Sequence, residues 1–177
     1  MKIKKLFFLL LVTLSMISCS SDDSVIPNTS GVLEGVWEMT SIDYYGDTIT
    51  TYGGVTTTSD FVGRGYDFEF YARFAEELTA YSTDGRYMEE RTTTVSGVDT
   101  VENYAVYDFY GGSWSRDGNN LAITDGDGTS TFTIEVLDDT MLKIKGTIIK
   151  NVSDEGYDKK TTKTVTIIYK RANEVTS

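Results

Sequence analysis

The sequence predicts an all-β domain in which about eight to ten antiparallel strands form an up-and-down meander that closes on itself. Three observations support this fold class. From Leu33 onward, short runs of alternating apolar and polar residues are separated by turn residues. The chain is rich in threonine and has 12 tyrosines and 16 glycines, a composition that suits pleated strands and tight turns. No stretch of the sequence has a helical pattern of useful length. A meander that stayed open would expose its edge strands, so we expect the sheet to close.

Composition and charge exclude several classes of protein. The 177 residues are enough for one domain, with 27 acidic and 16 basic side chains and a net charge of -11. Such a surface is a poor partner for nucleic acid, whose phosphates need clustered lysine and arginine. The chain has no histidine and one cysteine, which excludes histidine-based triads, the commonest zinc sites and internal disulfides. We therefore expect no metal, no cofactor and no enzyme activity.

Residues 1–18 have the pattern of a bacterial targeting segment. Three lysines among the first five residues precede an apolar run that is too short for a permanent membrane span. The run ends at Met16-Ile17-Ser18-Cys19, which resembles the lipobox of bacterial lipoproteins. The resemblance implies that Cys19, the single cysteine, is lipidated and becomes the first mature residue. Two or three acyl chains would give a stable membrane anchor.

The residues after Cys19 bear on localisation. Residues 19–31 are polar and predict a flexible tether, with a domain at 32–173. The acidic pair Asp22-Asp23 resembles a tag by which some Gram-negative anaerobes send lipoproteins to the cell surface. We expect a monomer that is anchored in the outer membrane. We further expect its domain to be exposed at the cell surface.

The first half of the domain divides into strands and turns. Trp37 and Met39 point to one side of the first strand, and a threonine-rich ribbon at 47–58 contains Gly53-Gly54. Asp84-Gly85 predicts a hairpin turn between strands at 78–82 and 87–95. In the strand between these features, alternation places five apolar residues on one face: Tyr66, Phe68, Phe70, Ala72 and Phe74.

The second half continues the meander. A strand at 99–109 precedes a strand that contains Trp114, and Asn119-Asn120 turns the chain into a short return strand at 121–123. Further strands are expected at 130–136 and 141–149. A polar loop from 151 to 159 should then precede the last strand, at 164–169.

From residue 33 to residue 171 the layout resembles the lipocalin-like lipoproteins of the calycin group. The resemblance rests on four segments: Gly35-Val36-Trp37, Gly112-Ser113-Trp114-Ser115, Gly118-Asn119-Asn120-Leu121, and Leu137-Asp138-Asp139-Thr140 within the hairpin 132–145. It implies a lipocalin-like β-barrel whose interior holds a small apolar molecule. The candidate lining residues are Trp37, Met39, Phe68, Phe70, Tyr104 and Trp114. No cysteine pair is present, and no arginine that packs on Trp37 can be assigned from the sequence.

Other patterns have simpler explanations. Asp125-Gly126-Asp127-Gly128 could supply oxygen ligands to calcium, but it lacks the distal bidentate acid, and turn chemistry explains it fully. Adjacent acidic pairs such as Glu89-Glu90 point to opposite faces of a strand, so they do not make a two-carboxylate glycosidase site. Tyrosines could stack on sugar rings, although strand propensity predicts the same tyrosines.

Three functional hypotheses follow. The first is a non-catalytic lipoprotein of the cell envelope that binds a small apolar or amphipathic ligand inside its barrel. The second is a packed barrel that docks on an envelope protein or a glycan, which an exposed aromatic patch away from the barrel mouth would favour. The third is an enzyme, which a buried carboxyl group with a raised pKa inside a cleft would favour.

Overall fold

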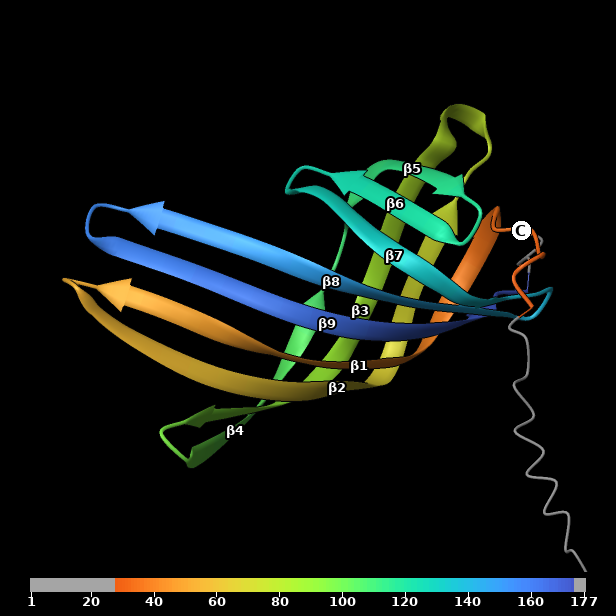
Figure 1. Ribbon diagram of the computed structural model, residues 1–177. Coiled ribbons are helices and arrows are strands. Elements are labelled where there is room, and N and C mark those ends of the chain that lie inside the picture. Colours follow the sequence, from red (N-terminus) through yellow and green to blue (C-terminus); the bar gives the residue numbers. More distant parts are fainter. Residues whose placement is uncertain (1–27, 174–177) are drawn as a thin grey trace, which may run out of the picture.

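The computed structural model describes residues 28–173, and most of them lie in β-strands (Figure 1). A single 3-10 turn, η1 (Glu77–Thr79), is the only helical element among these residues, and no helix there is long and apolar enough to cross a membrane. In chain order the strands are β1 (Gly35–Tyr52), β2 (Val55–Phe74), β3 (Ala80–Val95), β4 (Val98–Tyr107), β5 (Gly111–Asp117), β6 (Asn120–Asp125), β7 (Gly128–Leu137), β8 (Met141–Asp154) and β9 (Tyr157–Arg171).

Eight of the nine strands form a closed ring of hydrogen-bonded neighbours. The order is β2-β1-β9-β8-β7-β6-β5-β3, and β3 also pairs with β2, while β4 pairs only with β3. All pairings are antiparallel. The ring closes through a short ladder, because β3 meets β5 only over Ala80 to Ser82. The predicted fold class and the strand number are therefore confirmed, although the closed sheet is irregular.

The hairpin turn predicted at Asp84-Gly85 is wrong. β3 runs without a break from Ala80 to Val95, and Gly85 stays in the ladder opposite Phe70 of β2. Gly85 has a positive φ of 123°, and a Cβ there would lie 1.9 Å from the carbonyl oxygen of Glu69. The glycine thus lets the backbones of β2 and β3 approach closely, and the chain does not turn back at this position.

The face assigned to Tyr66 is also wrong, because β2 contains a β-bulge. Between Tyr66 and Glu69 two residues of β2 face one residue of β3, and Asp67 adopts a φ of 59°. An extra residue moves all following side chains to the opposite face. Tyr66 is consequently 41% exposed, whereas Phe70 is buried.

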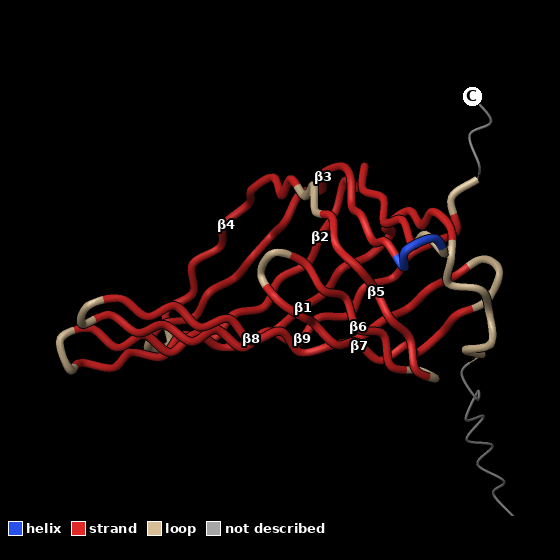
Figure 2. The backbone as a smooth tube through the Cα atoms, turned by 90° about the horizontal axis from the view of Figure 1, so that it is seen from above, coloured by secondary structure: helices blue, strands red, loops and turns tan. Residues whose placement is uncertain are grey.

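The polar loop predicted at 151–159 is strand. β8 continues to Asp154 and β9 starts at Tyr157, so only two residues turn the chain. The reason is pairing: both strands extend beside the equally long hairpin of β1 and β2. Residues 47–58 and 147–162 form a projection, here called the wing, on one side of the molecule (Figure 1). In Figure 2, β4 diverges from the wing strands.

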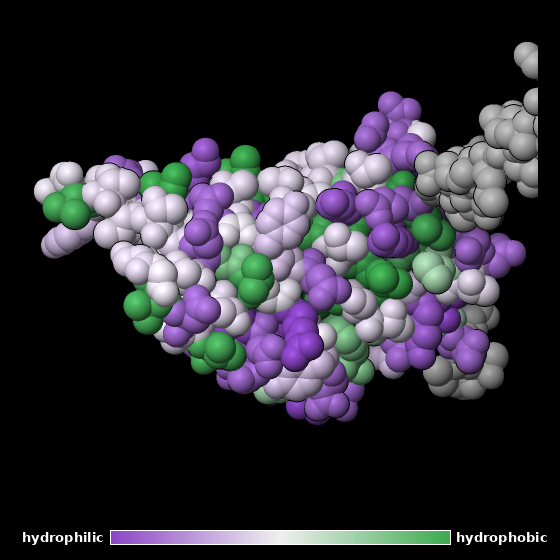
Figure 3. Space-filling view, turned by 60° about the horizontal axis from the view of Figure 1, so that its bottom comes forward, coloured by the Kyte–Doolittle hydropathy of each residue, from purple (hydrophilic) through white to green (hydrophobic). Residues whose placement is uncertain are grey.

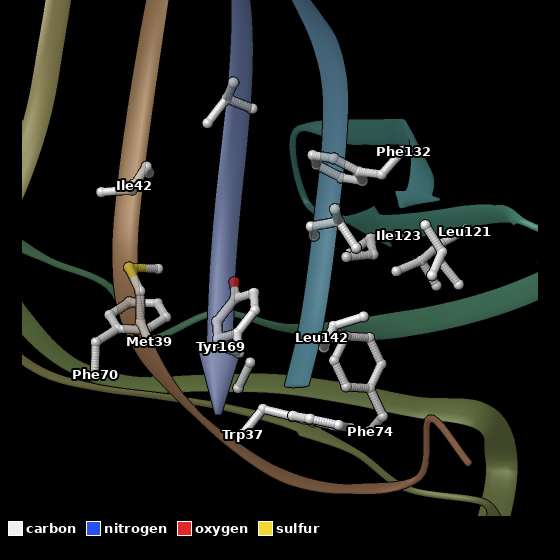
Figure 4. Packing of buried hydrophobic residues seen from close by; sticks show 14 of the residues in the cluster. Trp37, Met39, Ile42, Phe70, Phe74, Leu121, Ile123, Phe132, Leu142 and Tyr169 are labelled. Carbon is white, nitrogen blue, oxygen red and sulfur yellow. The ribbon is translucent and has the colours of Figure 1, made fainter. Parts of the chain in front are cut away.

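The closed end of the sheet is a packed floor. Trp37 is fully buried there, and its indole Nε1 donates a hydrogen bond to the carbonyl oxygen of Leu33 at 2.8 Å. Phe74 packs edge-on against Trp114, with ring centroids 6.0 Å apart. Figure 4 shows the core side chains pointing inward from facing strands. The floor therefore has the close packing expected of a protein interior.

The chain enters the domain at this floor. Residues 28–31, which we expected within the flexible tether, hydrogen-bond to β7: the Leu137 amide donates to Asn28, and the Gly31 amide donates to Leu137. Arg116 donates to the carbonyl oxygens of Thr29 and Gly31. Leu33 is buried beneath this segment. The stretch before β1 thus caps the closed end of the sheet.

Candidate functional site

A cavity of about 580 Å³ opens between the strands above the floor. Strands β1, β2, β3, β4, β6, β7, β8 and β9 contribute to its wall. This volume is within the range of small-molecule sites, about 300–1,000 Å³. Aromatic side chains make up much of the lining: Tyr44, Phe61, Tyr81, Tyr87, Tyr104 and Phe132.

Strand alternation places polar side chains among these aromatics. Tyr87, Glu89 and Arg91 lie two residues apart on β3, so all three project to the interior. On β4, Tyr104 and Val106 do the same from the neighbouring strand. The cavity wall therefore consists mainly of rows of strand side chains, and the segment between β4 and β5 adds Asp108 and Tyr110.

Glu89 is the most buried charged residue of the site, with 6% of its surface exposed. The hydroxyls of Tyr44 and Tyr104 both donate to its Oε1. Burial, followed by the hydrogen bond to Glu89, raises the pKa of both tyrosines. Both hydroxyls therefore remain protonated donors at neutral pH. Glu89 is fixed in place by these two bonds.

Gly63 makes room for this arrangement. A Cβ at Gly63 would lie 2.2 Å from both Cζ and the hydroxyl oxygen of Tyr44. The Tyr44 ring occupies that space and packs against Phe61, with centroids 5.9 Å apart. The glycine in the neighbouring strand thus positions one of the two donors to Glu89.

Two cationic side chains share this part of the cavity. The Arg91 guanidinium carbon lies 4.3 Å from the centroid of Phe61, and Lys163 Nζ lies 4.9 Å from the centroid of Tyr44. Neither cation takes part in an ion pair with any residue of the described range. Arg91 Nε is buried and has no hydrogen-bond partner there. Burial also lowers the pKa of Lys163.

Asp108 forms a second polar position, next to the start of β5. Its backbone amide donates to the Gly85 carbonyl oxygen, and its Oδ1 is buried without a hydrogen-bond partner in the described part of the chain. Burial raises the pKa of Asp108 to about 6, against an opposing hydrogen bond from Thr83. A buried, unpartnered acceptor can take a hydrogen bond from a bound molecule.

Replacing Asp108 with asparagine is expected to stabilise the fold by about 1 kcal/mol near pH 7, after allowance for solvent screening of this half-buried group. The native state holds the proton more tightly than the unfolded state, since the pKa rises from 3.8 to about 6. Stability therefore falls as pH rises through this interval. Urea unfolding near pH 7 and below pH 4 should show a gain only at the higher pH. An equal gain at both pH values would contradict the assignment.

The six predicted lining residues separate into two groups. Tyr104 lines the cavity. Trp37, Met39 and Phe70 are buried in the floor, and Phe68 packs against it. Trp114 is buried as well, and its Nε1 donates to the Ala75 carbonyl oxygen at 3.0 Å. These five lie in packed structure and are absent from the cavity wall. Cys19 lies outside the described residues, so its lipidation stays a prediction.

Sequence reasoning missed Arg171, the partner of Trp37. The Arg171 guanidinium carbon lies 4.1 Å from the Trp37 ring centroid, and Nη1 donates to the Glu34 carbonyl oxygen at 2.9 Å. A Cβ at Gly35 would lie 2.5 Å from that Nη1, which explains the glycine two residues before the tryptophan. This contact could have been inferred from the predicted closure of the sheet, because the end of the last strand then meets the start of the first strand.

The Asp125-Gly126-Asp127-Gly128 segment forms a turn. Asp125 Oδ1 accepts the backbone amide hydrogen of Asp127, and Asp127 pairs with Lys150 at 2.7 Å. Within residues 28–173 no group of three or more acidic or cysteine side chains is placed to hold a metal ion. The geometry of the segment is that of an Asx turn.

Comparison with known proteins identifies no relative. A scan against family models found no match, and searches of curated proteins and of solved structures found none either.

Proposed function

We propose that this protein is a lipid-anchored envelope protein with a lipocalin-like domain that binds one small amphipathic ligand in its cavity, without catalysis. The observation that carries the proposal is the cavity of about 580 Å³ with aromatic walls and two buried polar atoms that lack partners, Arg91 Nε and Asp108 Oδ1. Aromatic faces suit an apolar body. Unpartnered buried polar atoms are costly, and polar groups on a ligand would satisfy them.

The layout of the domain agrees with an anchored binding protein. The chain enters at the floor, beside Trp37 and Arg171, whereas the cavity lies farther along β1 and β9, beside Tyr44 and Lys163. A lipid on Cys19 would hold the floor toward the membrane and leave the cavity accessible from the other end.

An interaction module remains the alternative, and the surface gives it less support. Exposed apolar residues of the wing include Ile49, Tyr52 and Val55. On the face seen in Figure 3 such residues are scattered among polar ones and form no single large patch. Singly scattered apolar residues are normal for a protein surface.

Asp108 supports a second candidate, an acid-base enzyme, because it is a buried carboxyl group with a raised pKa in a cleft. Binding is the better-supported function. No side-chain hydrogen bond or ion pair in the described range joins Asp108 to a second acid or base, and such a partner is the usual sign of acid-base catalysis.

The direct test is titration of the full chain with N-phenyl-1-naphthylamine, an uncharged aromatic probe whose fluorescence increases in apolar surroundings. A probe of this size should bind one saturable site with a Kd of roughly 10 μM, as expected from ligand efficiency. Failure to observe saturable binding would contradict the proposal.

A further inference from the structure

We propose that the cavity selects amphipathic acids: Arg91 and Lys163 bind the acidic group of the ligand, and the aromatic walls hold its apolar body. The acid can be a carboxylate, a phosphate or a sulfonate, since each offers anionic oxygens to these two cations. This inference rests on the proposed function, because it specifies the class of molecule that the same cavity takes.

Each of the two cations lies against an aromatic ring. Arg91 lies over the ring of Phe61, and Lys163 lies over the ring of Tyr44. Interior cations are more usually held by carboxylates. A ring face does not accept a hydrogen bond from every N–H group of the cation. Arg91 Nε is buried and has no hydrogen-bond partner in the described structure.

Three of the four acidic side chains that line the cavity already have partners. Glu89 accepts the hydroxyls of Tyr44 and Tyr104, Asp127 pairs with Lys150, and Asp125 caps its own turn. The fourth acid, Asp108, also lines the cavity and interacts electrostatically with Lys163, but burial disfavours its charged form. The group formed by Glu89, Arg91 and Lys163 therefore carries a net positive charge.

An acidic ligand would also relieve an energetic cost in the cavity. Burial lowers the pKa of Lys163, which means that its charged form is destabilised where it lies. An anion in contact with Lys163 and Arg91 would relieve this cost and satisfy the free donor. A general excess of basic residues cannot explain the pair, because the chain has a net charge of -11.

The test compares two probes with the same aromatic body. 1-Anilinonaphthalene-8-sulfonate differs from N-phenyl-1-naphthylamine only by its sulfonate. The full chain should bind the sulfonate roughly tenfold more tightly, the size expected for a charge-assisted contact. If the neutral probe binds and the sulfonate binds no more tightly, the acid selection is wrong while the binding function stands. If neither probe binds, the proposed function fails with it.

Variants assign the preference to the pair. Lys163→Met and Arg91→Met should each weaken sulfonate binding by roughly fivefold to tenfold and should weaken neutral-probe binding by much less, so that the preference for the sulfonate falls. Lys159→Met, an exposed change on the same strand as Lys163, should alter neither. Glu89→Gln should act in the opposite direction and tighten sulfonate binding, because it removes the adjacent negative charge. A merely structural role for the cations predicts equal losses for both probes and no gain for Glu89→Gln, which would overturn the proposal.

Competition identifies the acid. Dodecanoate and dodecyl phosphate should displace the bound sulfonate probe at concentrations at which dodecyl maltoside does not. The compound that displaces the probe at the lower concentration carries the preferred acidic group. Displacement by inorganic phosphate alone, with no advantage for either dodecyl compound, would show a free-anion site and overturn the amphipathic ligand.

Discussion

Replacing Trp37 with alanine is expected to lower the free energy of unfolding by about 3–5 kcal/mol, the usual cost of removing a large buried aromatic side chain. Trp37 is fully buried, donates a hydrogen bond to Leu33 and supports the guanidinium of Arg171. Its loss would open a void in the floor and free the segment that caps it. Urea unfolding of the full chain measures the change.

The matched control for this prediction is Tyr52→Ala at the tip of the wing. Tyr52 is 70% exposed, so its removal should change stability by less than about 0.5 kcal/mol. A loss of only about 1 kcal/mol for Trp37→Ala would show that the floor is not the main source of stability.

Replacing Val106 with tryptophan is expected to weaken binding of the neutral probe more than tenfold, about 1.4 kcal/mol or more. Val106 is half-buried on β4 and lines the cavity. An indole at this position would occupy space that the ligand needs. Fluorescence titration of the full chain measures the loss.

Val101→Trp provides the control on the same strand. Val101 is 59% exposed and lies outside the cavity wall, so the added indole should leave the affinity unchanged. If Val106→Trp binds the probe as the unaltered chain does, the probe binds elsewhere, for example at the apolar N-terminal residues, which both variants retain.

The sequence allowed prediction of the closed meander because it depends on local patterns. Trp37 and Met39 alternate with polar neighbours, and short turns separate the strands. The cavity residues could not be predicted in the same way. Which side chains of β1 and β2 point into the cavity depends on a bulge in each strand, because a bulge moves the following side chains to the opposite face. The position of a bulge is known only from the pairing of the strands.

Long-range pairing also explains the other omissions. Arg171 lies 134 positions after Trp37, and the two meet only because β9 pairs with β1. Glu89 looks like half of a solvent-exposed acidic pair in the sequence, yet Tyr44 and Tyr104 surround it in the structure. Asp84-Gly85 has the composition of a turn, but continuous pairing with β2 keeps it in a strand. In each case tertiary contacts outweigh the local preference.

Native mass spectrometry of the protein purified gently from its own host tests the central claim most directly. We expect a reproducible additional mass that is lost on denaturation, belongs to an amphipathic acid and is reduced in Val106→Trp. A bare protein mass from the host, together with no saturable probe binding, would contradict a ligand-binding cavity and favour a domain that acts through its surface.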